Sequence, residues 1–105
     1  MGRALILLCL LASCTTPKHL VIFSKTEDFR HDSIPDGAAA ITTIGHELGY
    51  EVTHTETSSD VVDIEYDVIV FLSTTGDVLN ETEQHYLQHF VENGGAFVGI
   101  HAATN

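Results

Sequence analysis

Two histidines follow apolar runs of this sequence and are well placed to do chemistry. His101 comes directly after one short apolar run, and His31 lies in the polar loop after another. Near neutral pH an imidazole can act as a general base, a hydrogen-bonding group or a metal ligand. His31 and His101 are therefore our candidate catalytic residues. They are also possible zinc ligands, although two histidines fall short of a full coordination set. For His101 the alternative role is to cap its turn by hydrogen bonding.

Polar side chains in the same loops are suited to holding hydroxyl groups. Arg30 could bind a carboxylate or a sugar hydroxyl, or it could pair locally with Asp32. The loop after a third apolar run carries hydroxyls and a carboxylate of the kind used in polyol recognition: Ser73, Thr74, Thr75 and Asp77. These residue types also form turns and helix caps, so both roles stay open. Phe29 could stack on a sugar ring or serve in packing.

A second pair of histidines has the spacing of a helical zinc site but not its surroundings. His85 and His89 are four residues apart within a predicted helix. On a helical wheel they lie beside Glu81 and opposite the apolar side chains, which indicates a solvated face. The other histidines have no partner pattern and are predicted to be structural: His19, His46 and His54.

Four short apolar runs alternate with helical patterns along the chain. The predicted strands are residues 19–24, 51–55, 67–73 and 96–101. One helix is expected from Ser33 until Gly49 stops it, and another from an N-cap at Asn80 until Gly94, with its apolar face formed by Tyr86, Leu87, Phe90 and Val91. Residues 56–65 form a connection with room for one helical turn. This order predicts an α/β fold with a doubly wound parallel sheet, right-handed crossovers and helices on both faces.

The carboxyl ends of the strands are the expected location of a site in such a sheet. Three loops should meet there: residues 25–32, 73–77 and 101–105. The residues around His101 repeat the small-residue spacing of a nucleophile elbow, in which Gly99 and Ala103 leave room for a tight strand-to-helix turn. The central residue is a histidine where a serine or a cysteine would usually stand.

The composition excludes some classes of partner. Only four Lys and Arg stand against fifteen Asp and Glu, giving a formal net charge of -11. Such a surface repels phosphate backbones, so we expect no nucleic acid partner and no polybasic membrane patch.

The first residues have the pattern of an export leader. Arg3 precedes an apolar stretch, residues 4–12, that is too short to span a bilayer. The stretch ends at residues 11–14, Leu-Ala-Ser-Cys, which resembles a bacterial lipobox. We expect a signal peptide over residues 1–13, lipidation of Cys14, a tether over residues 14–18 and a domain over residues 19–105. An ordinary signal peptide that happens to contain a cysteine is the alternative. The predicted location is the periplasm, outer membrane or cell surface of a bacterium.

Both cysteines, Cys9 and Cys14, lie in this leader, so the body offers no thiolate nucleophile or disulfide. A doubly wound sheet tolerates an uncovered apolar edge strand poorly. We therefore expect the chain to be the N-terminal part of a domain truncated after its fourth strand, with further domains possible downstream.

Three blocks of the sequence resemble one known family. Residues 29–34, 70–79 and 94–103 look like successive blocks of the ThuA-like (trehalose utilisation) family. The resemblance implies a flavodoxin-like fold of the class I glutamine amidotransferase type. It also implies a role in the use of trehalose and related disaccharides through keto-sugar intermediates. Glutaminase chemistry needs a thiolate at the elbow, where this chain has His101, so the chain is not expected to be a glutamine amidotransferase.

Two hypotheses for function remain. The first is a carbohydrate-active enzyme domain in which His101 and His31 do acid–base or metal-assisted work on a sugar or keto-sugar. In it, Arg30 and the residues of the 73–77 loop hold the hydroxyls. The second is a non-catalytic carbohydrate-binding or assembly module that keeps the scaffold without its nucleophile.

Overall fold

The computed structural model describes residues 16–103 and confirms the predicted α/β architecture. The expected leader with its lipidation site at Cys14 lies outside the described residues. Four parallel strands form one sheet: β1 (His19–Phe23), β2 (Glu51–Thr55), β3 (Val68–Leu72) and β4 (Ala96–Ile100). Their order is β2-β1-β3-β4, so β1 and β3 are the two central strands of this sheet.

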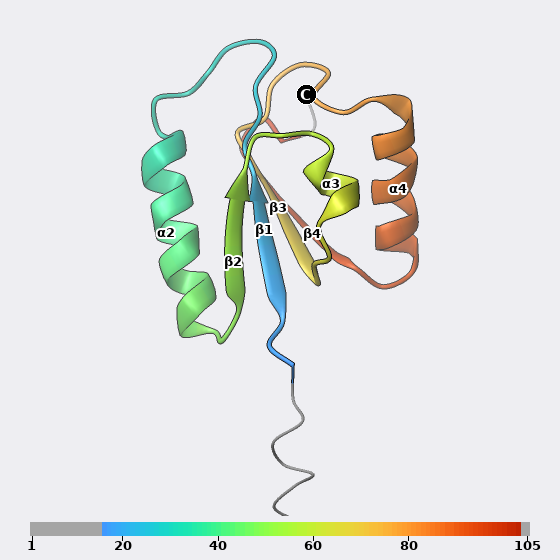
Figure 1. Ribbon diagram of the computed structural model, residues 1–105. Coiled ribbons are helices and arrows are strands. Elements are labelled where there is room, and N and C mark those ends of the chain that lie inside the picture. The colour runs from blue at the N-terminus through green and yellow to red at the C-terminus, as the bar shows by residue number, and fades with distance from the viewer. Residues whose placement is uncertain (1–15, 104–105) are drawn as a thin grey trace, which may run out of the picture.

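Helices cover both faces of the sheet (Figure 1). The helix α2 (Ile34–Glu47) packs on one face, and the single turn α3 (Asp60–Asp63) and the helix α4 (Glu81–Glu92) lie on the other. Because neighbouring residues of a strand point to opposite faces, β1 and β3 supply two separate cores. The core under α2 contains Leu20, Ile22, Val70, Leu72, Ile34 and Ala38. The core under α3 and α4 contains Val21, Phe23, Ile69, Phe71, Val61, Val78 and Ala103.

The helix boundaries follow from the residue types expected to set them. Pro35 lies in the first turn of α2, and Gly49 ends that helix with a φ of 87°. Asn80 caps α4 through a capping box, in which its side chain accepts from the amide of Glu83 and the Glu83 carboxylate accepts from the amide of Asn80. Both predicted helices therefore begin and end close to the residues expected to bound them.

The differences from the expected elements are small but informative. Ser24, Ser73 and His101 were placed in strands and instead lie just beyond them. Of the four apolar residues expected on the buried face of α4, Leu87 and Phe90 pack on the core, whereas Tyr86 is 38% and Val91 45% exposed. The buried face of α4 is narrower than predicted because this helix packs largely against the short α3.

The sheet ends differently on its two sides. The edge strand β2 is polar apart from Val52, which suits the edge of a sheet. On the other side β4 pairs only with β3 among residues 16–103, and Val98 and Ile100 are 44% and 37% exposed. In the described part of the chain no helix is both long and apolar enough to cross a membrane.

Tyr66 should make the fold less stable at high pH. Burial raises the pKa of Tyr66 to about 12, and the neighbouring Tyr86 adds to the rise. The folded protein therefore keeps this proton between about pH 10 and pH 12, where the unfolded chain has released it. This contribution to the free energy of unfolding is complete below about pH 10 and is lost as the pH rises, by ~1 kcal/mol because the side chain is only half-buried. Urea unfolding at about pH 9 and about pH 11 should show a smaller alkaline loss in Tyr66→Phe. An equal loss in both proteins would contradict this assignment.

Candidate functional site

The turn after β4 has the geometry of an elbow, with His101 at its tip. His101 has a φ of 62°, in the left-handed region that an L-residue adopts at a cost of about 1–2 kcal/mol. The amide of Ala103 donates to the carbonyl oxygen of His101 at 2.8 Å, which closes the turn. A Cβ on Gly99 would lie 3.1 Å from the Cβ of Ala103, so the small residues on either side are what let the chain fold back. The turn therefore projects His101 at the carboxyl end of β4, as the spacing predicted.

A second residue beside this elbow shares its unusual backbone. Ser73, just after β3, has a φ of 50°, and its amide donates to the carbonyl oxygen of Ile100 at 3.0 Å. Among the described residues, Ser73 and His101 are the two non-glycine residues with positive φ. Backbone strain of this kind collects at functional sites, where the surrounding structure enforces it. Here both strained residues line the same cavity.

The loop after β1 is fastened to the loop after β3, and this contact positions His31. Thr26 and Thr75 form a parallel bridge, and the amide of Glu27 donates to the carbonyl oxygen of Thr75 at 2.8 Å. The Thr75 hydroxyl donates to the carbonyl oxygen of Phe29 at 2.7 Å. The loop therefore crosses above β3 and carries His31 toward β4.

Arg30 secures the same loop on its other side. Its guanidinium donates two hydrogen bonds to the Glu56 carboxylate, of 2.7 Å from Nη1 and 2.8 Å from Nη2. This hydrogen bonding, with the Coulombic attraction of Glu56, raises the pKa of Arg30 despite some desolvation. The pairing with Asp32 that the sequence left open is therefore replaced by a bidentate pair with a residue after β2. In this arrangement Arg30 joins two loops of the carboxyl end.

The two candidate histidines are in contact. The rings of His31 and His101 meet edge to face, with centroids 4.4 Å apart and planes at 88°. Phe29 also packs edge-on against His31, with centroids 4.9 Å apart, while remaining 69% exposed. The His31 imidazole therefore contacts both the His101 ring and the Phe29 ring.

A cavity of about 480 Å³ opens beside the histidine pair. It lies on the α2 side of the sheet, between the first turn of α2 and the ends of β3 and β4. Its walls are His31, Ser33, Asp36, Gly37, Leu72, Ser73, Ile100 and His101. One side is polar and comes from the start of α2, and the other is apolar and comes from Leu72 and Ile100. Its size and mixed lining are those of a small-molecule site.

Four predicted binding residues lie outside this cavity: Arg30, which pairs with Glu56, and three residues of the loop after β3. Thr74 is buried and its hydroxyl donates to the carbonyl oxygen of Ala103 at 3.2 Å, while the Thr75 hydroxyl is committed to Phe29. Asp77 is exposed in the following turn. Only Ser73 of that loop reaches the cavity, so the two threonines hold the elbow and the first loop in place.

Asp36 is, with Ser33, a polar cavity residue that the sequence analysis did not assign to the site. It lies in the first turn of α2, where a carboxylate complements the helix dipole. In the structure it lines the cavity together with Ser33. The signal that could have found it is the position of α2: a helix that follows β1 in such a sheet begins at the carboxyl end, so its first turn faces the site.

The other histidines lie elsewhere. His85 and His89 are exposed on α4 near Glu81 and Glu92, which confirms the predicted solvated face. The His19 imidazole hydrogen-bonds to two neighbouring segments. Its Nδ1 lies 2.8 Å from the Glu65 carbonyl oxygen, and its Nε2 lies 2.7 Å from the Thr53 hydroxyl. Within residues 16–103 no three side chains form a group that could hold a metal ion. His31 and His101 would need ligands from outside these residues to hold zinc.

A parallel α/β sheet in the order β2-β1-β3-β4, with a strained elbow and a cavity at its carboxyl ends, places the chain in the flavodoxin-like class. Within that class, the family model ThuA, described as trehalose utilisation, matches residues 19–105. The chain belongs to the ThuA family. Searches of curated proteins and of solved structures gave no match. Family membership links the chain to trehalose utilisation and to a sugar-related small molecule as its ligand.

Proposed function

We propose that the cavity beside His31 and His101 binds trehalose or a related keto-disaccharide and that the two histidines process it by acid–base chemistry. The observation that carries the proposal is the contact of two imidazoles, 4.4 Å between centroids, at the wall of a cavity of about 480 Å³. Two adjoining imidazoles can divide the work of a general acid and a general base, since each can hold or release a proton near neutral pH.

The lining suits a sugar ring. Ser33 and Asp36 offer a hydroxyl and a carboxylate to the sugar hydroxyls, and Ser73 adds a second hydroxyl. Leu72 and Ile100 offer an apolar surface to the C–H face of the ring. A neutral ligand also fits a strongly acidic protein, since it meets no repulsion from the net charge of -11.

Asp36 and Asp32 provide a matched test of this cavity. Both acids lie at the start of α2, but only Asp36 lines the cavity. Asp36→Asn should weaken the binding of trehalose or its keto derivative about tenfold, because a hydrogen bond to a charged group contributes about 1.5–3 kcal/mol. Asp32→Asn should leave the affinity unchanged. Calorimetric titration measures both, with product formation followed by chromatography in the same samples. Equal affinities for the two variants would show that the sugar binds elsewhere.

A non-catalytic carbohydrate-binding or assembly module is the second candidate. It is favoured by one observation: the tip of the elbow carries His101 where related scaffolds need a nucleophile. It predicts the same sugar affinity and the same loss in Asp36→Asn, but no product.

We further propose that the chain is exported and attached to a membrane by a lipid on Cys14. The support is the lipobox-like sequence of residues 11–14. Residues 14–18 would then lead to the amino end of β1, so the histidine cavity, at the opposite end of the sheet, would face away from the membrane. Cys14→Ala should move the protein from the membrane fraction to the soluble extract. Unchanged fractionation of this variant would contradict the lipid attachment.

A further inference from the structure

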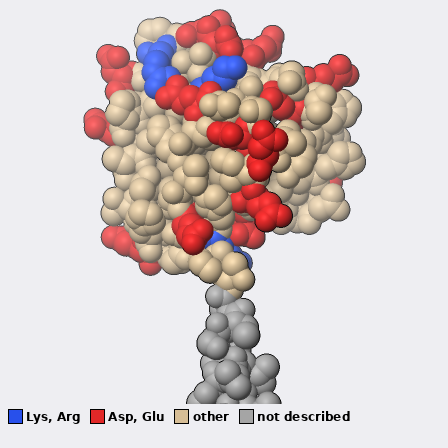
Figure 2. Space-filling model, viewed as in Figure 1, with Lys and Arg blue, Asp and Glu red and all other residues tan. Residues whose placement is uncertain are grey.

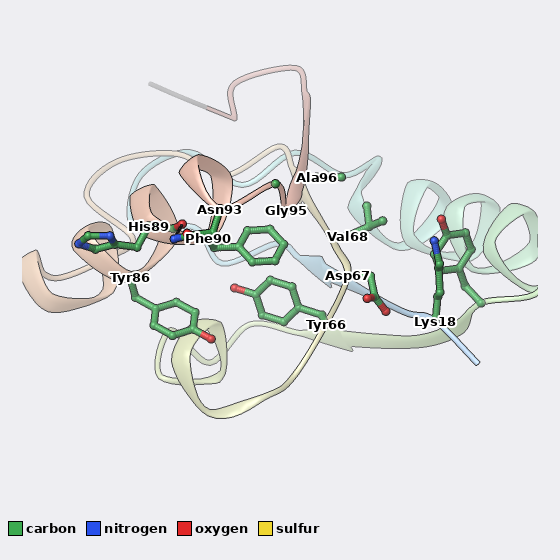
Figure 3. Close-up of a pocket in the computed structure, with 12 residues that line it drawn as sticks. Lys18, Tyr66, Asp67, Val68, Tyr86, His89, Phe90, Asn93, Gly95 and Ala96 are labelled. Atoms are coloured by element: carbon green, nitrogen blue, oxygen red, sulfur yellow. Dashed lines mark hydrogen bonds between the residues drawn. The ribbon is translucent and has the colours of Figure 1, made fainter. Parts of the chain in front are cut away.

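All three tyrosines of the sequence line one hollow at the amino ends of the strands, opposite the histidine cavity. Tyr50, Tyr66 and Tyr86 come from three different segments and line it together with Phe90. The hollow has a volume of about 630 Å³, larger than that of the histidine cavity. Figure 3 shows the side chains of Tyr66, Tyr86 and Phe90 on one side of it and that of Lys18 on the other, with Asp67 between them.

The rings are held in place by the fold. Tyr66 packs edge to face on Phe90, with centroids 4.9 Å apart, and its hydroxyl donates to the carbonyl oxygen of Val61 at 2.7 Å. Phe90 lies so close to Gly95 that a Cβ at that position would overlap its ring. Because the Tyr66 hydroxyl is committed within the protein, this residue presents its ring to the hollow. Tyr86, one helical turn before Phe90, is 38% exposed and belongs to neither core.

Carboxylates adjoin these rings. A second hollow, also of about 630 Å³, shares Tyr66, Asp67 and Tyr86 with the first and adds Glu65. Asp67 accepts the amide of His19 at 2.8 Å through Oδ2, which fixes the carboxylate without neutralising it. The second hollow therefore combines two aromatic faces with two acids, and Lys18 lines only the first hollow. The protein has a net charge of -11, and the face seen in Figure 2 carries few basic side chains.

Aromatic faces beside carboxylates are suited to cations. The ring quadrupole attracts a cation within about 6 Å of the ring, and the attraction is greatest for a weakly hydrated group such as a quaternary ammonium. A neutral sugar could also stack on these rings and donate its hydroxyls to the acids, but only a cation gains as well from the negative field of the protein. The charges therefore favour a cationic ligand over a neutral one.

We propose that the second hollow, where Tyr66, Tyr86, Asp67 and Glu65 line it, binds an alkylammonium group of the choline type. This site is separate from the proposed sugar site, since the two lie at opposite ends of the parallel strands. An ammonium ligand and a sugar would therefore bind at the same time.

Choline and dimethylbutanol, its uncharged isostere, provide the test. The sequence has no tryptophan, and two of its three tyrosines form the site, so tyrosine fluorescence of the purified full-length chain reports on it. Choline should change the fluorescence saturably, whereas dimethylbutanol at the same concentration should not. No response to choline, an equal response to both compounds, or a response to trehalose instead would overturn the proposal.

Variants assign the response to the named residues. Tyr86→Leu should weaken choline binding about fivefold, and Tyr86→Phe, which keeps the ring, should bind as the wild type does. Glu65→Gln, at an exposed side chain, should weaken binding without affecting thermal unfolding. Wild-type affinity in both Tyr86→Leu and Glu65→Gln would overturn the assignment. Phosphatidylcholine vesicles are the second arm: if they compete with choline the ligand is a lipid headgroup, and if they do not it is a free ammonium compound.

Discussion

His101→Asn is expected to lower the turnover of a keto-disaccharide by about a hundredfold or more while leaving the fold intact. General acid–base catalysis typically contributes about 10²–10⁴ in rate, and asparagine cannot exchange a proton near neutral pH. Asparagine is the informative substitution because it tolerates the left-handed conformation that His101 adopts, with a φ of 62°. It can also still cap a turn by hydrogen bonding. The variant therefore separates the two roles that the sequence left open for this residue.

Backbone strain gives His101 a second, independent signature. If the histidine is present for its chemistry and not for stability, a protein with glycine at this left-handed position should be at least as stable as the wild type. His101→Gly is expected to keep or raise the free energy of unfolding, since relief of about 1–2 kcal/mol of backbone strain offsets the added flexibility of the unfolded chain. Full turnover in His101→Asn, or a large destabilisation by His101→Gly, would mean that the residue is structural. Turnover is measured by chromatography and stability by urea unfolding.

Phe71→Ala is expected to lower the free energy of unfolding by about 3–5 kcal/mol. Phe71 is 4% exposed and contacts two other rings, with its centroid 5.0 Å from that of Phe23 of β1 and 5.0 Å from that of Phe97 of β4, and with the planes tilted by 51° and 55°. Removing the ring leaves a cavity. It also breaks two aromatic contacts, each of which contributes about 0.5–1.5 kcal/mol beyond burial. Such a loss is a large share of the stability of a domain of this size.

Phe29→Ala is the matched control for Phe71→Ala. It removes the same ring, but from a position that is 69% exposed, so urea unfolding should change by less than about 1 kcal/mol. Similar losses in the two variants would contradict the placement of the core between β1, β3 and β4.

The sequence predicted most of the fold because the apolar runs of β1 and β3 are buried on both faces, and such runs have few alternatives. The elbow was also predictable, since Gly99 and Ala103 are local to it. Local signals could not reveal Asp36 as a cavity residue or Glu56 as the partner of Arg30. Each of these contacts joins segments brought together only by the order of the strands.

The gathering of the tyrosines was missed for the same reason. Tyr50 precedes β2, Tyr66 precedes β3 and Tyr86 lies on α4, and nothing in their spacing indicates a common location. Tyr86 was expected in the core because the helical period alone does not fix how wide the buried face of α4 is. The packing of α4 against the single turn of α3 decides that width.

The most direct test of the central claim is a measurement of intermolecular nuclear Overhauser effects between trehalose, or its keto derivative, and the aromatic protons of the protein. We expect contacts from one sugar molecule to the imidazole protons of both His31 and His101, together with contacts to the methyl groups of Leu72 or Ile100. Contacts to only one of the two imidazoles, or to Tyr66 and Tyr86 in their place, would contradict a sugar site built on the histidine pair.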